Sequence, residues 1–266
     1  MRRNLSRLLA VCCLFVSAVP AFAAVTSKAI DYADGDTPLR GYLYWDDAAQ
    51  GKRPGVLVVH EWWGLNDYAK NRAQQLAGLG YVAFALDMYG AGKVTRHPDE
   101  AGAWMKTVNQ NIDAWVRRAT AGLNVLKQQP LVDTAKLAAI GYCFGGATVQ
   151  QLAYAGADLA GVVSFHGAIT LPSEAQYGKI KTRILIAHGN ADPFATDAQL
   201  DAMRAALDRS GADWDMLILG GAKHGFTNPE AGSYGMDALA YDEKADHRSW
   251  KAMLDMFDEL FGKVSP

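Results

Sequence analysis

Short, uninterrupted apolar runs recur along this chain and restrict its fold more than any other feature. A continuous apolar run bounded by turn residues is typical of a strand that is covered on both faces, as in a parallel sheet. An earlier segment, residues 41–45, alternates instead and predicts an antiparallel strand. The continuous runs occupy residues 56–59, 82–86, 137–142, 162–165, 183–187 and 216–219.

Helical patterns separate these runs. The first places Tyr68, Arg72 and Leu76 on one side, and Gly80 follows as a typical C-terminal stop. A longer pattern opens at Pro98, and a last one spans the C-terminal region. We expect the aromatic residues of the longer pattern to pack in the core rather than to form a binding surface. The stripe of the longer pattern contains Ala101, Trp104, Met105, Val108, Ile112, Trp115, Val116, Ala119 and Leu123, and that of the last contains Trp250, Met253, Leu254, Phe257, Leu260 and Phe261.

Strands that alternate with helices predict an α/β fold with a mostly parallel central sheet flanked by helices on both faces. The sequence has no internal repeat and no linker, so we expect residues 24–266 to form one domain. Half of the 266 residues are hydrophobic and 20% are charged, which excludes a mostly disordered chain. With 26 basic and 28 acidic residues, nothing indicates the basic patches that bind nucleic acid or acidic membranes.

The first 23 residues have the pattern of a secretory signal peptide. A basic start without acidic residues precedes the apolar run of residues 8–19, which is too short to span a bilayer of about 30 Å. The small residues of the pattern Ala21-Phe22-Ala23 then predict cleavage after Ala23. We therefore expect the protein to be exported, either to the periplasm or out of the cell. The basic residues at the start are Arg2, Arg3 and Arg7.

Removal of this segment changes both the charge and the cysteine content. It takes away three arginines and no acidic residue, so the formal net charge falls from −2 to −5. It also takes away Cys12 and Cys13, and of the three cysteines only Cys143 remains. In an oxidising compartment a lone thiol is a chemical liability unless it is buried or used. No other apolar run is long enough to span a membrane, so we expect no membrane association after cleavage.

Cys143 lies in the segment GYCFGG, residues 141–146, between an apolar run and a helical stretch. The pattern G-x-C-x-G is that of a nucleophile elbow with cysteine in place of serine. Gly141 and Gly145 are needed there because the backbone approaches itself closely where a strand turns sharply into a helix. Such a turn exposes the thiol at the carboxyl edge of the sheet and directs a helix N-terminus at it, which favours the thiolate. The alternative is a small buried cysteine at a glycine-rich turn.

A thiol nucleophile needs a base, and the base needs a residue that orients it. In this kind of fold the chain order is nucleophile, acid, histidine. Asp192 follows the run at residues 183–187, and His224 follows the run at residues 216–219. Both therefore fall on loops at the carboxyl ends of strands, where ligand sites collect in open α/β sheets. The sequence predicts a triad of Cys143, Asp192 and His224.

The other histidines are weaker candidates. His166 and His188 stand at strand ends as either core or supporting residues, and His60, which ends a strand next to Glu61, is either supporting or catalytic. We expect His97 and His247, which lie in helical surroundings, on the surface. Neither H-E-x-x-H nor paired C-x-x-C spacing is present, so metal-dependent chemistry is not favoured. The prediction is an enzyme without a metal ion or another cofactor.

The chain resembles the dienelactone hydrolase family of α/β-hydrolases in four segments. They are GYCFGG at residues 141–146, HGNADP at 188–193, HGF at 224–226 and HEWWGL at 60–65. The resemblance extends over essentially the whole chain after the signal peptide. It implies an α/β-hydrolase fold with the triad described above, and it implies hydrolysis of a carboxylic ester or a lactone.

The resemblance also implies a role for Glu61, because such a glutamate in the family interacts with the cysteine and helps to generate the thiolate when substrate binds. A carboxylate near a thiol opposes its ionisation, so the resting thiol stays neutral and less prone to oxidation. We expect the oxyanion hole to use the backbone N–H groups of Phe144, directly after the nucleophile, and Trp62, in the loop after an earlier strand. The cysteine would form a thioacyl enzyme, and the histidine would protonate the leaving oxygen and then activate water.

The sequence departs from the family where the substrate carboxylate is bound. The dienelactone enzymes use two arginines there, one soon after a strand-end Asp-x-Tyr segment and one a few residues past the histidine. This chain has no arginine directly at either place, and Lys93 and Arg96 are the candidates to replace them. Dienelactone itself is therefore only weakly implied as a substrate. We expect an apolar pocket lined by Trp62, Trp63, Tyr89 and Phe226, with simple packing at strand ends as the alternative.

The leading prediction is an exported hydrolase that acts on the ester or lactone bond of a small molecule. One alternative is a binding or redox-responsive thiol protein that uses the same fold without turnover. Another is cleavage of a thioester or an amide by the same machinery. Residues 230–242 contain two glycines and several polar residues, and they form either a lid near His224 or an ordinary connection.

Overall fold

The computed structural model describes residues 25–264. The predicted signal peptide, with Cys12 and Cys13, lies outside the described residues. Within the described chain, Cys143 is a free and partly exposed cysteine. None of the described helices combines the length and the apolar character that a membrane crossing requires.

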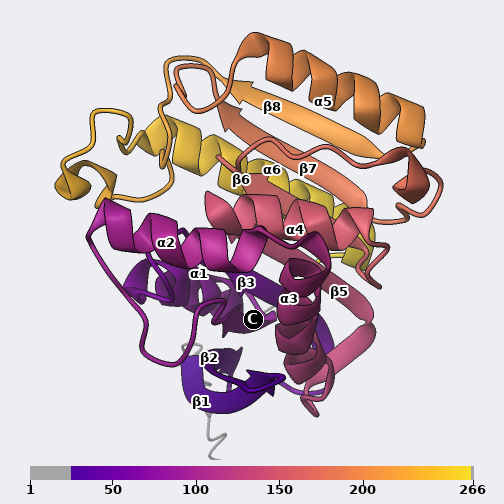
Figure 1. Ribbon diagram of the computed structural model, residues 1–266. Coiled ribbons are helices and arrows are strands. Elements are labelled where there is room, and N and C mark those ends of the chain that lie inside the picture. Colours follow the sequence, from indigo (N-terminus) through magenta and orange to yellow (C-terminus); the bar gives the residue numbers. More distant parts are fainter. Residues whose placement is uncertain (1–24, 265–266) are drawn as a thin grey trace, which may run out of the picture.

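The core of the molecule is an eight-stranded sheet with the order β1-β2-β4-β3-β5-β6-β7-β8 (Figure 1). Strands β3 to β8 run parallel to one another, whereas β2 pairs antiparallel with both β1 and β4. Every predicted apolar run lies in a strand, and the alternating segment lies in the antiparallel β2. The strands are β1 (Val25–Asp34), β2 (Thr37–Asp46), β3 (Arg53–Val59), β4 (Val82–Leu86), β5 (Val132–Tyr142), β6 (Gly161–Phe165), β7 (Arg183–Gly189) and β8 (Trp214–Leu219).

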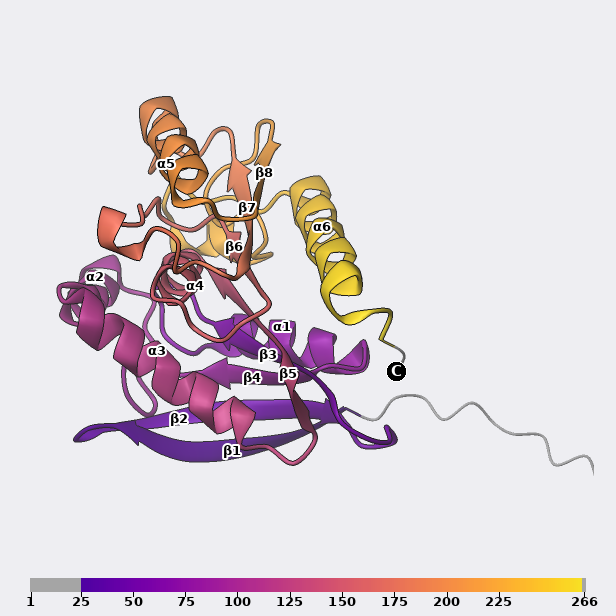
Figure 2. The same cartoon turned by 90° about the vertical axis from the view of Figure 1, so that its right-hand side faces the viewer.

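Helices cover both faces of this sheet, as Figure 2 shows, so the predicted fold class is confirmed. Apolar side chains of α3, α4 and α5 fill the core on one face. Those of α1 and α6 fill the core on the other face. The helices are α1 (Asp67–Gly78), α2 (Pro98–Asn109), α3 (Ile112–Lys127), α4 (Phe144–Tyr154), α5 (Asp197–Ser210) and α6 (Glu243–Phe261), with short 3₁₀ turns η1 (Glu174–Gln176) and η2 (Ala231–Tyr234).

Two features of the fold differ from the sequence prediction. The long helical pattern after Pro98 is two helices, because the Asn111 side chain accepts a hydrogen bond from the Ala114 N–H and begins α3 anew. The break leaves Ile112, which the stripe would bury, 54% exposed. Strand β1 was not predicted, since an edge strand that is largely exposed does not need a continuous apolar run.

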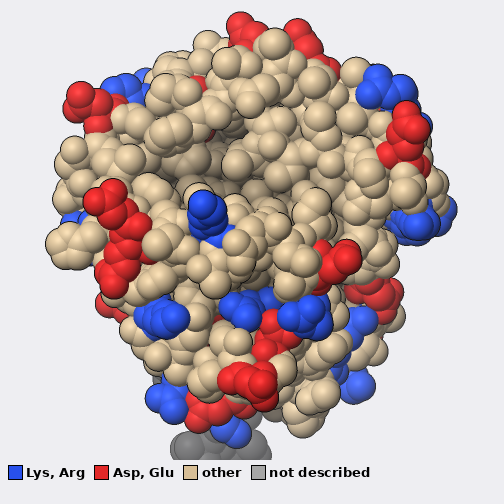
Figure 3. Space-filling view, in the orientation of Figure 1, with Lys and Arg blue, Asp and Glu red and all other residues tan. Residues whose placement is uncertain are grey.

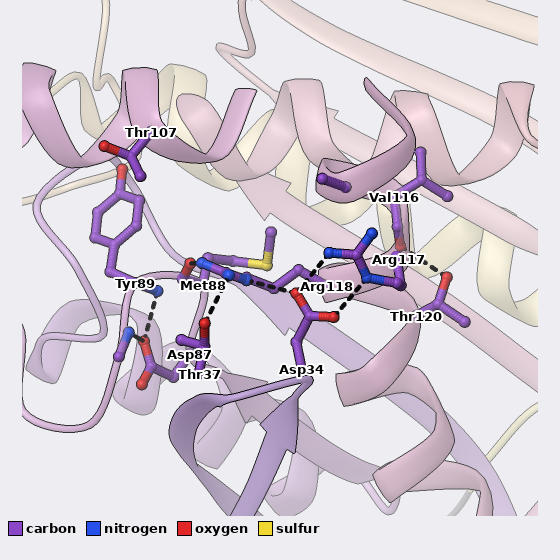
Figure 4. A network of polar contacts seen from close by, with 12 residues as sticks. Asp34, Thr37, Asp87, Met88, Tyr89, Thr107, Val116, Arg117, Arg118 and Thr120 are labelled. Atoms are coloured by element: carbon purple, nitrogen blue, oxygen red, sulfur yellow. Dashed lines mark hydrogen bonds and ion pairs between the residues drawn. The ribbon is translucent and has the colours of Figure 1, made fainter. Parts of the chain in front are cut away.

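A buried aspartate fastens the β1–β2 hairpin to α3 and to the end of β4 (Figure 4). Asp34 accepts hydrogen bonds from Arg117 Nε at 2.7 Å and from Arg118 Nε at 3.0 Å. Arg118 also donates to Thr37 Oγ1 and to the Met88 carbonyl oxygen. Burial alone would raise the pKa of Asp34, but its hydrogen bonds to the two arginines lower that pKa below its ordinary value.

We predict that Asp34→Ala lowers the free energy of unfolding by about 2 kcal/mol, because two guanidinium groups lose their shared carboxylate. The Arg117 side chain is 63% exposed and regains water, which keeps the loss moderate. Thermal denaturation measures it, and Tm should fall by about 4–8 °C. Asp31→Ala, on the same strand, removes an exposed pair with Arg40 and should leave Tm unchanged. Equal Tm values for the two variants would contradict the structural role of Asp34.

Candidate active site

Cys143 occupies a sharp turn between β5 and α4. Its backbone angles are φ 53° and ψ −113°, a left-handed conformation that side chains other than glycine rarely adopt. A Cβ atom at Gly141 would lie 2.0 Å from the Gly145 carbonyl oxygen, and one at Gly145 would lie 2.3 Å from the Val59 carbonyl oxygen. The two flanking glycines are therefore required for the turn. The following helix, α4, directs its N-terminus at the thiol.

The loops after β7 and β8 bring an aspartate and a histidine together at the same edge of the sheet. His224 Nδ1 lies 2.7 Å from Asp192 Oδ2. The other oxygen of Asp192 accepts a hydrogen bond from the Phe194 N–H at 2.9 Å, which fixes the carboxylate. Both side chains are buried, and both line one cavity with Cys143. The structure thus places the three predicted triad residues in one site.

The charges of this site are strongly coupled. Burial alone would lower the pKa of His224, but the facing Cys143 thiol and the hydrogen bond to Asp192 outweigh it and raise the pKa to about 10. Burial would raise the pKa of Asp192, whereas the hydrogen bond to His224 and its charge hold that pKa below its ordinary value. The imidazole is therefore a cation at neutral pH, and the Asp192 carboxylate lies against it.

The raised pKa has a testable consequence. Because it lies above the ordinary value of 6.5, the charge of His224 stabilises the fold fully below pH 6.5, and this contribution is lost as the pH rises through about 10. We predict an NMR titration midpoint for the His224 ring near pH 10 in the wild type and a lower midpoint in Cys143→Ala. The exposed His97 is an internal control in both proteins. A wild-type midpoint near 6.5 would contradict the coupling.

The two residues predicted to form the oxyanion hole both have a backbone N–H without a partner in the described chain. Trp62 follows β3 and Phe144 begins α4, and both residues line the cavity. Within residues 25–264, neither N–H donates a hydrogen bond to the protein. The turn that carries Trp62 is braced by His60, whose Nδ1 contacts the Glu61 carbonyl oxygen and whose Nε2 accepts from the Met88 N–H at 3.2 Å. Burial lowers the pKa of His60, so its ring is neutral and makes both contacts.

Glu61 lies near His224, but its hydrogen bond is to Asn228 and not to Cys143, the expected partner. Its carboxylate accepts a hydrogen bond from Asn228 Nδ2 at 2.8 Å, and in the described chain it makes none to Cys143. Burial raises the pKa of Glu61 to about 7, against the hydrogen bond from Asn228 and the positive charges of His224 and Arg72. Glu61 is not among the residues that line the cavity.

The cavity at the thiol has a volume of about 380 Å³, which suits a small molecule. Its walls come from α2, α3, α4 and the loops that carry the aspartate and the histidine. On the face shown in Figure 3 the surface is hollowed, and the hollow has mostly uncharged walls. The lining residues are Trp62, Met105, Asn109, Trp115, Cys143, Phe144, Ala147, Gly167, Ala168, Thr170, His188, Asp192, Phe194, Ala195, His224, Met236 and Leu239.

Of the four aromatic residues predicted to line this pocket, Trp62 does so and the other three lie elsewhere. Trp63 is buried and stacks on Tyr234 with ring centroids 4.1 Å apart. Tyr89 packs behind Phe144, and Phe226 is fully buried against His166. Each points into packed chain behind the strand ends, so none of them lines the cavity.

Residues that the sequence assigned to the core form cavity walls instead. Met105 and Trp115 belong to the apolar stripe of α2 and α3, and both line the cavity. Trp115 serves both purposes, since its ring stacks on Phe144 and its Nε1 donates to Thr148 Oγ1 at 2.8 Å. The stripe was a visible signal, but a sequence pattern does not tell which part of a helix face meets a void.

The segment at residues 230–242 forms another part of the cavity wall. Met236 and Leu239 line the cavity, and the Ala240 N–H donates to the His224 carbonyl oxygen at 3.1 Å. A further backbone hydrogen bond joins Asp242 to Phe226. The segment is therefore paired along the histidine loop, as an ordinary connection would be.

The two candidate cations for a substrate carboxylate are exposed and lie outside the cavity. Lys93 Nζ lies 5.8 Å from the centre of the Trp104 ring. Arg96 donates to Ser233 and lies over the Tyr234 ring. Neither residue replaces the family arginines in this structure.

The remaining histidines fall into two groups. His166 and His188 are buried, and burial lowers the pKa of each. His97 and His247 are exposed, as expected. In the part of the chain that the structure describes, no group of three His, Cys, Asp or Glu side chains is arranged to hold a metal ion.

A mostly parallel sheet, a nucleophile elbow after its central strand β5 and a histidine loop after its last strand define an α/β-hydrolase. A sequence model of the dienelactone hydrolase family matches residues 39–261. The chain therefore belongs to the dienelactone hydrolase family, whose members hydrolyse carboxylic esters.

Individual relatives agree with this assignment. A dienelactone hydrolase-like promiscuous phosphotriesterase from metagenomic libraries has 44% sequence identity and a TM-score of 0.87, and the match covers 90% of this chain and 100% of that one. An uncharacterized protein of Caenorhabditis elegans is 35% identical over 147 residues, which are 54% of this chain and 92% of that protein. A protein of Aquifex aeolicus named "Putative carboxymethylenebutenolidase" is 26% identical, over 86% of this chain and 96% of its own length.

Proposed function

We propose that this protein is an exported hydrolase that cleaves esters or lactones through a cysteine-bound acyl intermediate. One observation carries the proposal: a cysteine in a left-handed conformation shares a cavity with a buried His224–Asp192 pair. A non-catalytic thiol protein would not need that pair, nor the two N–H groups predicted to form the oxyanion hole. The catalytic residues of the proposed hydrolase are Cys143, Asp192 and His224.

In acylation, the Cys143 thiolate attacks the carbonyl carbon and forms a carbon–sulfur bond. The carbonyl oxygen takes up the negative charge and accepts hydrogen bonds from the N–H groups of Phe144 and Trp62. When the tetrahedral intermediate collapses, the carbon–oxygen bond breaks and the His224 imidazolium gives its proton to the leaving oxygen. The products are a free alcohol and a thioacyl enzyme.

Deacylation uses the same histidine as a base. Acylation removes the thiolate charge that helps to raise the pKa of His224, so the imidazole is now neutral and can take a proton from water. The resulting hydroxide attacks the thioester, the acid leaves, and the Cys143 thiolate and His224 imidazolium are restored. Asp192 holds the ring orientation and balances its charge in both steps.

We assign Glu61 the role of a buried acid that tunes this charge system. With a pKa raised to about 7 by burial, it changes charge in the working pH range and sits close enough to His224 to interact with its charge. Glu61→Gln keeps the size of the side chain but removes the titration. We expect the pH profile of Cys143 alkylation by iodoacetamide to lose an inflection near pH 7. A pH profile of alkylation that is unchanged in Glu61→Gln would contradict this role.

Export is proposed from the first 23 residues, which combine a basic start, a short apolar run and a small-residue cleavage pattern. The full-length chain should be recovered outside the cytoplasm of a bacterial host with Ala24 as its first residue. A protein that stays in the cytoplasm and keeps Met1 would contradict the proposal.

A substrate panel tests the proposed activity and separates it from its alternatives. The panel contains p-nitrophenyl esters, a lactone, a thioester and, because one relative is named a phosphotriesterase, a neutral phosphotriester. We expect hydrolysis of the esters, and loss of that activity after the thiol is blocked with iodoacetamide. Turnover of the thioester alone would favour a thioesterase, and no turnover of any compound would favour a binding protein.

A further inference from the structure

We infer that the substrate of this site is an uncharged ester with an apolar group beside the scissile bond, and that esters carrying a carboxylate are rejected. The inference rests on the proposed function, since it concerns the same cavity. It separates this chain from an enzyme that recognises a substrate by its acid group.

The cavity has no charged side chain that would bind a carboxylate carried by the substrate in addition to its ester group. Among the described residues that line it, there is no lysine and no arginine. Asn109 and Thr170 are its polar side chains apart from those at the triad and His188. An ionised carboxylate that leaves water needs a cation or several hydrogen-bond donors in compensation, so entry of such a group is disfavoured.

The one cation inside the cavity is already neutralised. His224 is hydrogen-bonded to the Asp192 carboxylate with Nδ1 and Oδ2 2.7 Å apart, so a buried anion already matches its charge. A substrate carboxylate would meet the negative charge of that aspartate without a free cation. Arg72, the nearby buried guanidinium, is itself paired with Asp246 at 2.6 Å.

Apolar side chains from two parts of the chain line the cavity that contains the thiol. One wall is built by Trp115, Met105 and Phe144, from α2, α3 and the start of α4. The other contains Phe194 and Met236, from the loops that carry the aspartate and the histidine. Phe194 is 54% exposed and its ring meets the His224 ring edge-on at 5.0 Å, so it stands at the entrance. Aliphatic or aromatic groups gain by leaving water beside such walls.

The test uses two esters of equal length that differ only at the chain end. p-Nitrophenyl pentanoate ends in a methyl group, and mono-p-nitrophenyl glutarate carries a carboxylate in its place. We expect the wild type to prefer the pentanoate by about 100-fold in kcat/KM. The methyl ester of the glutarate, which restores neutrality, should be hydrolysed nearly as well as the pentanoate.

A designed cation identifies the cause of the preference. Met236 lies in a loop at the cavity and is partly exposed, so a long basic side chain fits there with its head in water. Met236→Arg should reduce the preference at least about 10-fold, whereas Met236→Gln, of similar length but neutral, should not. Asn109→Lys is a second site for the same change if the first variant does not fold.

The outcomes separate this inference from the proposed function. Equal kcat/KM values for both esters, with activity lost in Cys143→Ala, would overturn the inference and leave the hydrolase mechanism standing. A strong preference that neither cation variant reduces would also overturn it. Hydrolysis that persists in Cys143→Ala would instead overturn the proposed function.

Discussion

Replacing Cys143 by alanine should lower kcat/KM for an activated ester by at least about 1,000-fold. The methyl group cannot form the carbon–sulfur bond on which the reaction depends, and the cavity without it contributes only binding and the oxyanion hole. The fold should survive, because alanine fits wherever the cysteine side chain fits and the tight turn is held by Gly141 and Gly145. Stopped-flow release of p-nitrophenolate measures the loss, and thermal denaturation verifies the fold.

Cys143→Ser is the conservative companion of this variant. Serine keeps the shape and can hydrogen-bond, but its hydroxyl does not ionise near neutral pH, so most of the activity should also be lost. Activity within threefold of the wild type in Cys143→Ala, with an unchanged Tm, would refute a nucleophilic role for this thiol.

The second large effect is expected at the aspartate. Asp192→Asn should lower kcat by about 100- to 10,000-fold, since a neutral amide no longer balances the charge on His224 and can favour the wrong tautomer of the ring. The carboxylate is buried and holds His224 Nδ1 at 2.7 Å, so no other group replaces it. Steady-state kinetics on the same activated ester measures the change.

A matched control lies a few residues along the same loop. Asp197 is exposed and begins α5, so Asp197→Asn changes the same charge without touching the histidine. It should leave kcat unchanged. If both variants lose activity equally, the aspartate acts only through the overall charge of the loop, and the triad assignment fails.

The sheet and the position of the proposed nucleophile could be predicted because local sequence determines both. A strand covered on both faces has to be continuously apolar, as residues 56–59 and 82–86 are. A sharp turn from strand to helix needs Gly141 and Gly145, since a Cβ atom at either one would overlap the backbone. The order of strands along the chain then places the loops of the aspartate and the histidine at one edge.

The walls of the cavity could not be predicted in the same way, because a local sequence pattern does not determine how far apart the helices, strands and loops lie. Trp63, Phe226 and Trp115 are all large aromatic residues, yet of these three only Trp115 lines the cavity. The partner of Glu61 was also hidden, since Asn228 lies 167 positions away in the chain. Strand β1 was not predicted for a different reason. Much of it is exposed to solvent, so polar residues are tolerated there and no apolar run is present.

The central claim is that the reaction passes through an acyl group bound to Cys143. A p-nitrophenyl dimethylcarbamate tests it most directly, because the carbamoyl group it transfers is hydrolysed slowly and accumulates. The account predicts release of about one equivalent of p-nitrophenolate per protein and a matching mass increase on the peptide that contains Cys143, with neither in Cys143→Ala. Release without an adduct, or an adduct on another residue, would contradict it.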